Sequence, residues 1–239
     1  MTADTAREEE ILIDFWSKAL APSPEDQAVE TQPGPGDWKD LAPAEKLFRA
    51  AASLGRRKKV LDYGCGSAWA GIIAAKSGCP DVTAADPAPG AAEAARVYAA
   101  LFGVEDRLKA VCIPKNWLSA VPAGTYDGFI CSNVLDVIPP ETAEYILREA
   151  ARICTRDAAV IIGLNFHLTP EAAFRRNMEL KDGNRLYVDG VLRLVSRSDG
   201  EWTSLFSPYF TVEKLEHFAW PGEKSEARRL FTLRKRADA

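Results

Sequence analysis

Hydrophobic and polar positions recur at helical spacing near the start of the chain. Residues 8–20 place Ile11 and Phe15 on one face among acidic positions, and residues 40–54 continue with the same kind of spacing. Both segments predict helices. Between them, residues 21–37 hold four prolines and two glycines, which predicts a loop.

Short apolar runs then alternate with helical segments. The runs are residues 59–62, 82–85, 108–113, 128–131 and 158–164, and the helical segments are residues 67–78, 91–102 and 141–154. Strands that alternate with helices predict a parallel, doubly wound sheet. The last run is apolar throughout, which is typical of a strand covered on both faces.

The remainder of the chain is β-rich. Residues 186–194 hold the pair Asp189-Gly190 between two β-prone runs, which predicts a hairpin. Residues 210–218 and 229–233 predict two further strands. The pattern therefore indicates an α/β fold with an inserted hairpin.

Composition narrows the class of protein. The chain has 239 residues, of which 47% are hydrophobic, enough for one sizeable core. No run approaches the roughly 18 apolar residues of a membrane span, and the acidic first ten residues do not resemble a signal peptide. We therefore expect a cytoplasmic protein without a membrane partner.

Charge and cysteine content exclude further classes. The formal net charge is -4, whereas nucleic-acid binders usually carry a basic excess, so no nucleic-acid partner is expected. The five cysteines form no Cys-x-x-Cys pair, and the chain has two histidines. We expect neither a disulfide framework nor a metal site.

A glycine turn follows the first apolar run, in the sequence Val-Leu-Asp-Tyr-Gly-Cys-Gly-Ser-Ala of residues 60–68. Gly64 and Gly66 lack a Cβ atom, so a ligand can approach the backbone closely. Asp86 ends the next run, 24 residues after Asp62, near the spacing of a carboxylate that binds ribose hydroxyls. A dinucleotide site would need a third glycine where Trp69 stands, which argues against a nicotinamide-dependent oxidoreductase.

The Asp-x-Gly-Cys-Gly turn resembles motif I of the class I S-adenosylmethionine-dependent methyltransferases, and residues 126–136 resemble that family's fourth-strand motif. The resemblance covers roughly residues 50–164. It implies a doubly wound, mostly parallel sheet of the Rossmann-like methyltransferase type, with S-adenosylmethionine as cofactor. The residues it assigns to the cofactor are Asp62 near the methionine amine, Gly64, Cys65 and Gly66 in the turn, Asp86 and Pro87 at the ribose, and Ser132 and Asn133 beside the sulfonium.

The sequence departs from the family pattern in two places. Ala68 replaces the usual third glycine of motif I, and the usual acid after the third strand is missing. Asn116 and Trp117 stand near that place. The Asn116 oxygen is a candidate partner of the adenine amine and Trp117 a candidate for stacking on the ring, although both are also compatible with loop anchoring.

The resemblance also divides the chain, which we expect to be one domain over residues 1–239. Residues 1–54 would form an N-terminal helical cap, 55–164 the cofactor-binding core, 165–208 a substrate-lid insert, and 209–239 the C-terminal strands. The cap and the insert would enclose the acceptor. The chain is expected to act as a monomer or homodimer.

The expected function is methyl transfer to a small-molecule acceptor at an undetermined O, N or C atom. A protein or RNA methyltransferase, a non-catalytic S-adenosylmethionine-binding module and, less favoured, a nicotinamide-dependent oxidoreductase remain as alternatives. Methyl transfer can proceed by proximity alone, because the sulfonium is already electrophilic. Where the acceptor must lose a proton, His167 after the fifth strand and Asp136 after the fourth are the candidate bases. For His167, an ordinary loop position is the competing interpretation.

Overall fold

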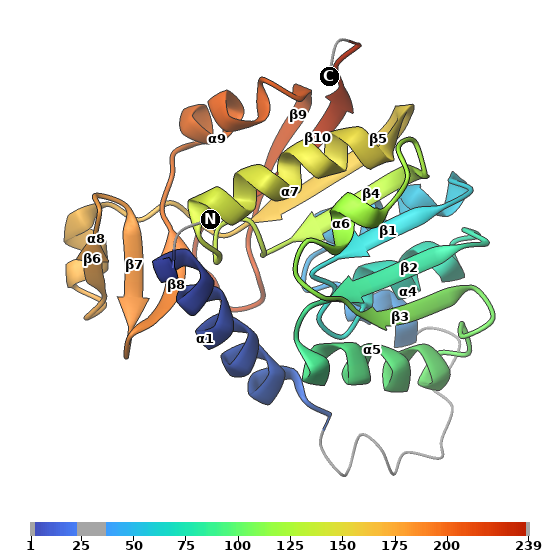
Figure 1. The fold of residues 1–239 in the computed structure, drawn as a ribbon, viewed down its shortest axis with the longest axis horizontal. Helices are drawn as coiled ribbons and strands as arrows, with labels where there is room; N and C mark the ends of the chain where they lie inside the picture. Colours follow the sequence, from blue (N-terminus) through green and yellow to red (C-terminus); the bar gives the residue numbers. More distant parts are fainter. Residues whose placement is uncertain (1–2, 23–36, 238–239) are drawn as a thin grey trace.

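The computed structural model describes residues 3–22 and 37–237, so most of the predicted loop of residues 21–37 lies outside the described residues. A seven-stranded sheet with the order β3-β2-β1-β4-β5-β10-β9 runs through the molecule (Figure 1). Its strands are β1 Val60–Tyr63, β2 Val82–Asp86, β3 Leu108–Cys112, β4 Tyr126–Ser132, β5 Cys154–Leu164, β9 Phe210–Phe218 and β10 Arg228–Lys235.

Strands β1 to β5 are parallel, while β10 pairs antiparallel with both β5 and β9. From β1 the chain builds outward to β2 and β3 on one side, and then to β4 and β5 on the other. The strand order therefore reverses between β1 and β4. In a doubly wound sheet, this reversal opens a crevice at the carboxyl ends of the strands. The predicted doubly wound, mostly parallel sheet is confirmed.

Helices cover the sheet on both faces. The helices of residues 3–22 and 37–237 are α1 Ala3–Leu20, η1 Asp37–Leu41, α3 Glu45–Ser53, η2 Leu54–Arg56, α4 Trp69–Lys76, α5 Pro89–Leu101, α6 Trp117–Ala120, α7 Pro140–Ile153, α8 Pro170–Phe174 and α9 Asp199–Phe206, of which α8 packs on the smaller sheet instead. Alternate strand residues belong to two separate apolar clusters, such as Phe129 with α7 and α9 on one face and Ile130 with α3 to α5 on the other. This two-sided burial explains the continuous apolar runs of the central strands.

A small second sheet lies beside the main one and consists of β6 Glu179–Lys181, β7 Arg185–Val188 and β8 Val191–Val195, all antiparallel. Asp189 and Gly190 adopt φ values of 51° and 76°, which forms the predicted two-residue hairpin turn. The sheet packs against α1 through a cluster of Leu12 with Tyr187, Leu192 and Val195 (Figure 1).

Across residues 3–22 and 37–237, we find no helix with both the length and the apolar character that a membrane crossing requires.

Candidate functional site

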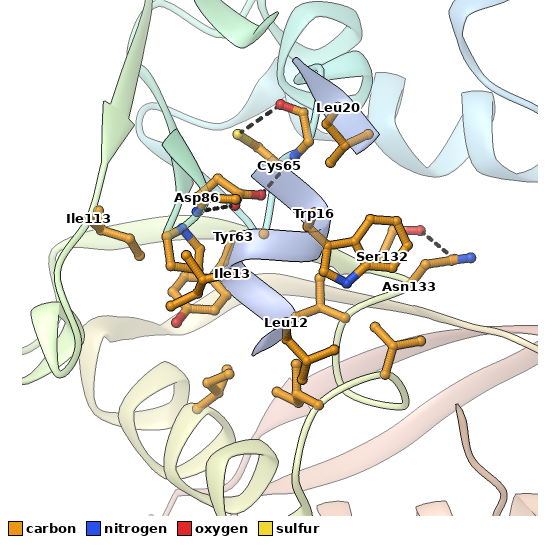
Figure 2. A pocket seen from close by; sticks show the side chains of 18 of the residues that line it. Leu12, Ile13, Trp16, Leu20, Tyr63, Cys65, Asp86, Ile113, Ser132 and Asn133 are labelled. Atoms are coloured by element: carbon orange, nitrogen blue, oxygen red, sulfur yellow. Dashed lines mark hydrogen bonds between the residues drawn. The ribbon is translucent and has the colours of Figure 1, made fainter. Parts of the chain in front are cut away.

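A cavity of about 380 Å³ lies where β1, β2, β3 and β4 end, at the crevice that the topology predicts. Its volume is in the range of small-molecule sites in proteins. Helix α1 passes across it, so that Leu12, Ile13 and Trp16 line the side opposite the strand ends (Figure 2). The fold and this crevice define a Rossmann-like α/β protein with an enclosed ligand site.

The glycine turn lines the cavity from Tyr63 to Ser67. Gly64 and Gly66 have φ values of 65° and 54°, in the left-handed region. A Cβ atom on Gly64 would lie 2.3 Å from a Val134 methyl carbon, so a larger residue cannot fit there. Ala68 also adopts a left-handed conformation, with φ of 61°, and so follows the path a third glycine would take.

Asp86 connects the end of β2 to the glycine turn. Its carboxylate accepts hydrogen bonds from the backbone N–H of Gly66 at 3.0 Å and of Ala88 at 2.8 Å. Burial raises the pKa of Asp86, and these two hydrogen bonds oppose the shift. A carboxylate has about four acceptor positions, so Asp86 can still bind ribose hydroxyls from the cavity side. Pro87 lies beside it in the wall.

The loop after β3 contributes Ile113, Pro114, Lys115 and Asn116 to the wall. Trp117 does not line the cavity. Its side chain is half-buried and packs against the apolar cluster that contains α7, because Trp117 is the first residue of the short helix α6. This placement agrees with the loop-anchoring interpretation of Trp117.

Asp62 also lies outside the cavity wall. It is buried and accepts a hydrogen bond from the backbone N–H of Gly71 in α4 at 2.8 Å. Desolvation raises the pKa of Asp62 to about 7, against the lowering effect of that hydrogen bond. In this structure Asp62 stabilises the junction between the turn and α4.

Neither predicted base reaches the cavity. His167 is exposed on the segment after β5 and is absent from the cavity wall. Asp136 is fully buried behind the wall, where its carboxylate accepts a hydrogen bond from the Asn165 backbone N–H at 2.6 Å. Burial raises the pKa of Asp136 to about 6. In this structure His167 therefore faces solvent and Asp136 is buried, and neither side chain lines the cavity.

The end of β4 brings Ser132 and Asn133 into the wall as predicted from their position. Asn133 has a φ of 58°, and its side-chain N–H donates to the Asn165 Oδ1 atom at 3.0 Å. Trp220, from the connection between β9 and β10, lines the same cavity. The sequence offered no periodic signal for Trp220, because its connection reaches the site only through the antiparallel pairing of the last two strands.

Helix α1 is attached to both sides of the crevice. Glu9 is buried, accepts a hydrogen bond from the Thr142 hydroxyl of α7 at 2.5 Å, and forms an ion pair with Lys115 at 3.2 Å. On the other side, the Ser17 hydroxyl accepts a hydrogen bond from the Gly90 N–H at 2.9 Å. The sequence predicted that the N-terminal helix covers the site, but residues 165–208 contribute no side chain to the cavity wall. The inserted sheet supports α1 from behind.

Comparisons with known proteins agree with this geometry. Residues 60–176 match a family model described as a methyltransferase domain. The chain is 33% identical over 191 residues to a ribosomal protein L11 methyltransferase from Geobacter sulfurreducens, an alignment that covers 78% of this chain. The chain spans 56% of the length of that relative, so the relative contains a further region without a counterpart in the alignment.

Two solved structures have the same fold over nearly the whole chain. One is the 1,6-didemethyltoxoflavin-N1-methyltransferase of Burkholderia thailandensis, solved with 1,6-didemethyltoxoflavin and S-adenosylhomocysteine bound, with a TM-score of 0.67 at 19% identity over 99% of this chain and 92% of that one. The other is the magnesium protoporphyrin IX methyltransferase of Synechocystis PCC 6803 with bound S-adenosylhomocysteine, with a TM-score of 0.64 at 16% identity over 95% of this chain and 100% of that one.

By sequence over residues 60–176 and by fold over nearly its whole length, the chain is therefore similar to Rossmann-like methyltransferases. The family resemblance carried by the glycine turn is confirmed.

Proposed function

We propose that this protein transfers the methyl group of S-adenosylmethionine to a small, largely apolar acceptor that binds beneath α1. The observation that carries the proposal is the continuity of the cavity wall. The glycine turn and the apolar underside of α1 line one space, together with Val137, Ile138 and Ile146 from the β4 exit and α7. An acceptor in that space would be covered by a helix.

The wall suggests how the cofactor lies. Asp86 would bind the ribose hydroxyls, and Ile113 to Asn116 would surround the adenine. The methionine tail would lie between the glycine turn and the β4 exit, at Ser132 and Asn133. Cys65 and Pro87 would contribute through backbone and apolar contacts. This placement leaves the underside of α1 for the acceptor.

The chemistry requires little from the protein beyond placement. S-adenosylmethionine would supply an electrophilic methyl group, which a lone pair on the acceptor would displace from sulfur, with the electrons of the carbon–sulfur bond going to S-adenosylhomocysteine. A proton on the acceptor atom would pass to solvent. Holding the acceptor in line and excluding water supplies most of the rate acceleration. We assign no general base, because His167 and Asp136 lie outside the cavity wall.

A protein acceptor is the second candidate, and the similarity to a ribosomal protein L11 methyltransferase favours it. Such an acceptor would need α1 to move away from the crevice, because Leu12, Ile13 and Trp16 fill the approach. Transfer of a labelled methyl group, measured in parallel on a panel of aromatic hydroxyl and nitrogen-heterocycle compounds and on ribosomal protein fractions, separates the two. Labelling of protein alone contradicts the small-molecule proposal.

Cofactor binding is tested with Asp86→Ala. We expect S-adenosylhomocysteine, but not NAD or NADP, to raise the melting temperature of the wild type. The substitution removes a buried, charge-assisted pair of hydrogen bonds, so calorimetry should find binding weaker by about 2–3 kcal/mol, on the order of 30- to 150-fold. Asp81→Ala, an exposed acid just before the opposite end of β2, is the matched control and should bind normally. Undiminished affinity in a folded Asp86→Ala protein contradicts the assignment.

A further inference from the structure

A chain of polar side chains runs behind the cavity wall, from the connection between β9 and β10 to the β4 exit. Arg228, at the start of β10, is buried with 5% of its surface exposed. Its guanidinium donates to the Asn165 Oδ1 atom at 2.5 Å, and the same oxygen accepts from the Asn133 side-chain N–H at 3.0 Å. Asn133 lines the cavity, whereas neither Arg228 nor Asn165 does.

The orientation of both amides follows from the chemistry of arginine. A guanidinium can only donate hydrogen bonds, so the Asn165 group that faces Arg228 must be its carbonyl oxygen. That oxygen can only accept, so Asn133 must direct its N–H₂ group toward Asn165. The Asn133 carbonyl oxygen therefore lies on the opposite side of the amide, away from Asn165.

The other side of Asn165 is also fixed. Asp136 accepts a hydrogen bond from the Asn165 backbone N–H at 2.6 Å, which fixes the backbone of Asn165 beside the β4 exit. The Asn165 Oδ1 atom accepts from both Arg228 and Asn133. The half-buried amide therefore cannot turn over without losing both hydrogen bonds.

Arg228 itself is held on three sides. Glu223 accepts from its Nε and Nη2 atoms at distances of 2.7 to 3.0 Å, and this ion pair lowers the pKa of Glu223. The centroid of the Trp220 ring lies 3.3 Å from the guanidinium carbon, and the Glu223 carboxylate also accepts from the Trp220 backbone N–H at 2.8 Å. Trp220 and Asn133 both line the cavity, so Arg228 contacts one residue of the wall directly and the other through Asn165.

We propose that Arg228 is a positioning residue: through Asn165, it holds the Asn133 carbonyl oxygen toward the cavity. There the Asn133 oxygen accepts a hydrogen bond from the ammonium group of the cofactor's methionine tail. The inference rests on the proposed function, which puts that tail between the glycine turn and Asn133. The Asn133 carbonyl oxygen accepts a hydrogen bond from the Ser132 hydroxyl at 3.3 Å, and an amide oxygen can accept a second one, so a cationic ligand group suits this wall. Asn165 lies between the Arg228 guanidinium and Asn133, so the buried positive charge of Arg228 stays away from the cofactor's ammonium group.

The test compares S-adenosylhomocysteine with methylthioadenosine, which keeps the adenosine and the sulfur but lacks the amino acid tail. We expect Arg228→Met and Asn133→Gly each to weaken S-adenosylhomocysteine binding about tenfold by calorimetry, the effect of one hydrogen bond to a charged group. Glycine keeps the positive φ of position 133. Methylthioadenosine should bind all variants within about twofold of the wild type, since the adenosine contacts are unchanged.

The double variant separates positioning from general destabilisation. If Arg228 acts through Asn133, then Arg228→Met adds no further loss when Asn133 is already glycine, whereas independent effects would multiply. Arg228→Lys keeps a donor and should recover part of the affinity. Lys46→Met is the matched control: Lys46 donates to the His217 carbonyl at 2.6 Å and pairs with Glu226, so it anchors the same connection without touching Asn165.

Three results with the variants would overturn the inference: normal S-adenosylhomocysteine binding by Arg228→Met, an equal loss for methylthioadenosine, or multiplying effects in the double variant. Should Arg228→Met fail to fold, Asn165→Leu carries the same comparison, with the same expected tenfold loss for S-adenosylhomocysteine alone. A wild-type protein that binds methylthioadenosine and S-adenosylhomocysteine equally also overturns it while leaving the adenosine site intact. A wild type that binds neither refutes the proposed function itself.

Discussion

At the scale of single residues, the glycine turn illustrates how backbone conformation decides which side chains a position accepts. Ala68 is fully buried and adopts φ of 61°, a conformation that costs an alanine about 1–2 kcal/mol. The backbone at position 68 therefore keeps the left-handed conformation, although alanine fits that conformation poorly. The buried methyl group compensates part of that cost, at about 0.8 kcal/mol.

We expect Ala68→Gly to change the free energy of unfolding by less than about 1 kcal/mol. Relief of the left-handed strain is offset by the lost methyl contact and by the greater chain entropy of glycine in the unfolded state. Ala68→Val should instead destabilise by more than about 2 kcal/mol, because a β-branched residue is strongly disfavoured at positive φ and the site has no free space. Denaturant unfolding of both variants measures the difference, and equal effects would contradict the argument.

The position of a residue in the sequence does not by itself decide whether its side chain lines the cavity. Asp136 and Asn133 both follow β4, three residues apart, yet Asn133 lines the cavity and Asp136 is buried behind it. The same holds for Asn116 and its neighbour Trp117. A motif predicts which strand end a residue occupies, but the turn conformation after the strand decides where its side chain lies.

At the scale of secondary structure, α1 is the element that turns an open crevice into a cavity. Its contact with α5 depends on a glycine: a Cβ atom on Gly90 would lie 1.9 Å from the Ser17 carbonyl oxygen. Gly90 does not line the cavity. A substitution at this position therefore acts on the attachment of α1 and leaves the cofactor contacts in place.

Gly90→Ala should displace α1 from α5. We expect faster hydrogen exchange in residues 3–20 and weaker S-adenosylhomocysteine binding, while β1 to β5 keep their protection. Gly200→Ala is the matched control, because a Cβ there meets no atom within 4 Å. Unchanged exchange of α1 in Gly90→Ala would mean that the helix is held by other contacts, such as Glu9 with Thr142.

The sequence allowed the existence of α1 to be predicted, but not the details of its attachment. Helical spacing in residues 8–20 requires only local information, whereas the partners of Glu9 and Ser17 lie on α7 and at the start of α5. The strands β1 to β5 and the hairpin at Asp189-Gly190 were predicted for the same local reason. Helix α9 was missed, although Ser198 and Glu201 form a capping box that marks its start.

At the scale of the whole molecule, stability should depend on pH in the opposite sense to ordinary paired carboxylates. Burial raises the pKa of Asp62 from 3.8 to about 7 and that of Asp136 to about 6. Between about pH 4 and pH 7 the folded protein therefore binds more protons at these sites than the unfolded chain. The free energy of unfolding then falls as pH rises, by up to about 1.4 kcal/mol per pH unit for each proton. The effect levels off above the folded pKa values.

Asp62→Asn isolates this contribution. Asparagine is neutral at every pH and its carbonyl oxygen can accept the hydrogen bond from the Gly71 N–H, so the packing is retained while the buried charge is removed. Relative to the wild type, the variant should gain stability steadily as pH rises from about 5 to about 8, since only the wild type must ionise a buried acid. Denaturant unfolding at each pH measures the difference, with Asp106→Asn, an exposed position, as the control. Curves that stay parallel for Asp62→Asn and the wild type would show that Asp62 ionises normally inside the fold, and that the turn it supports is open to water.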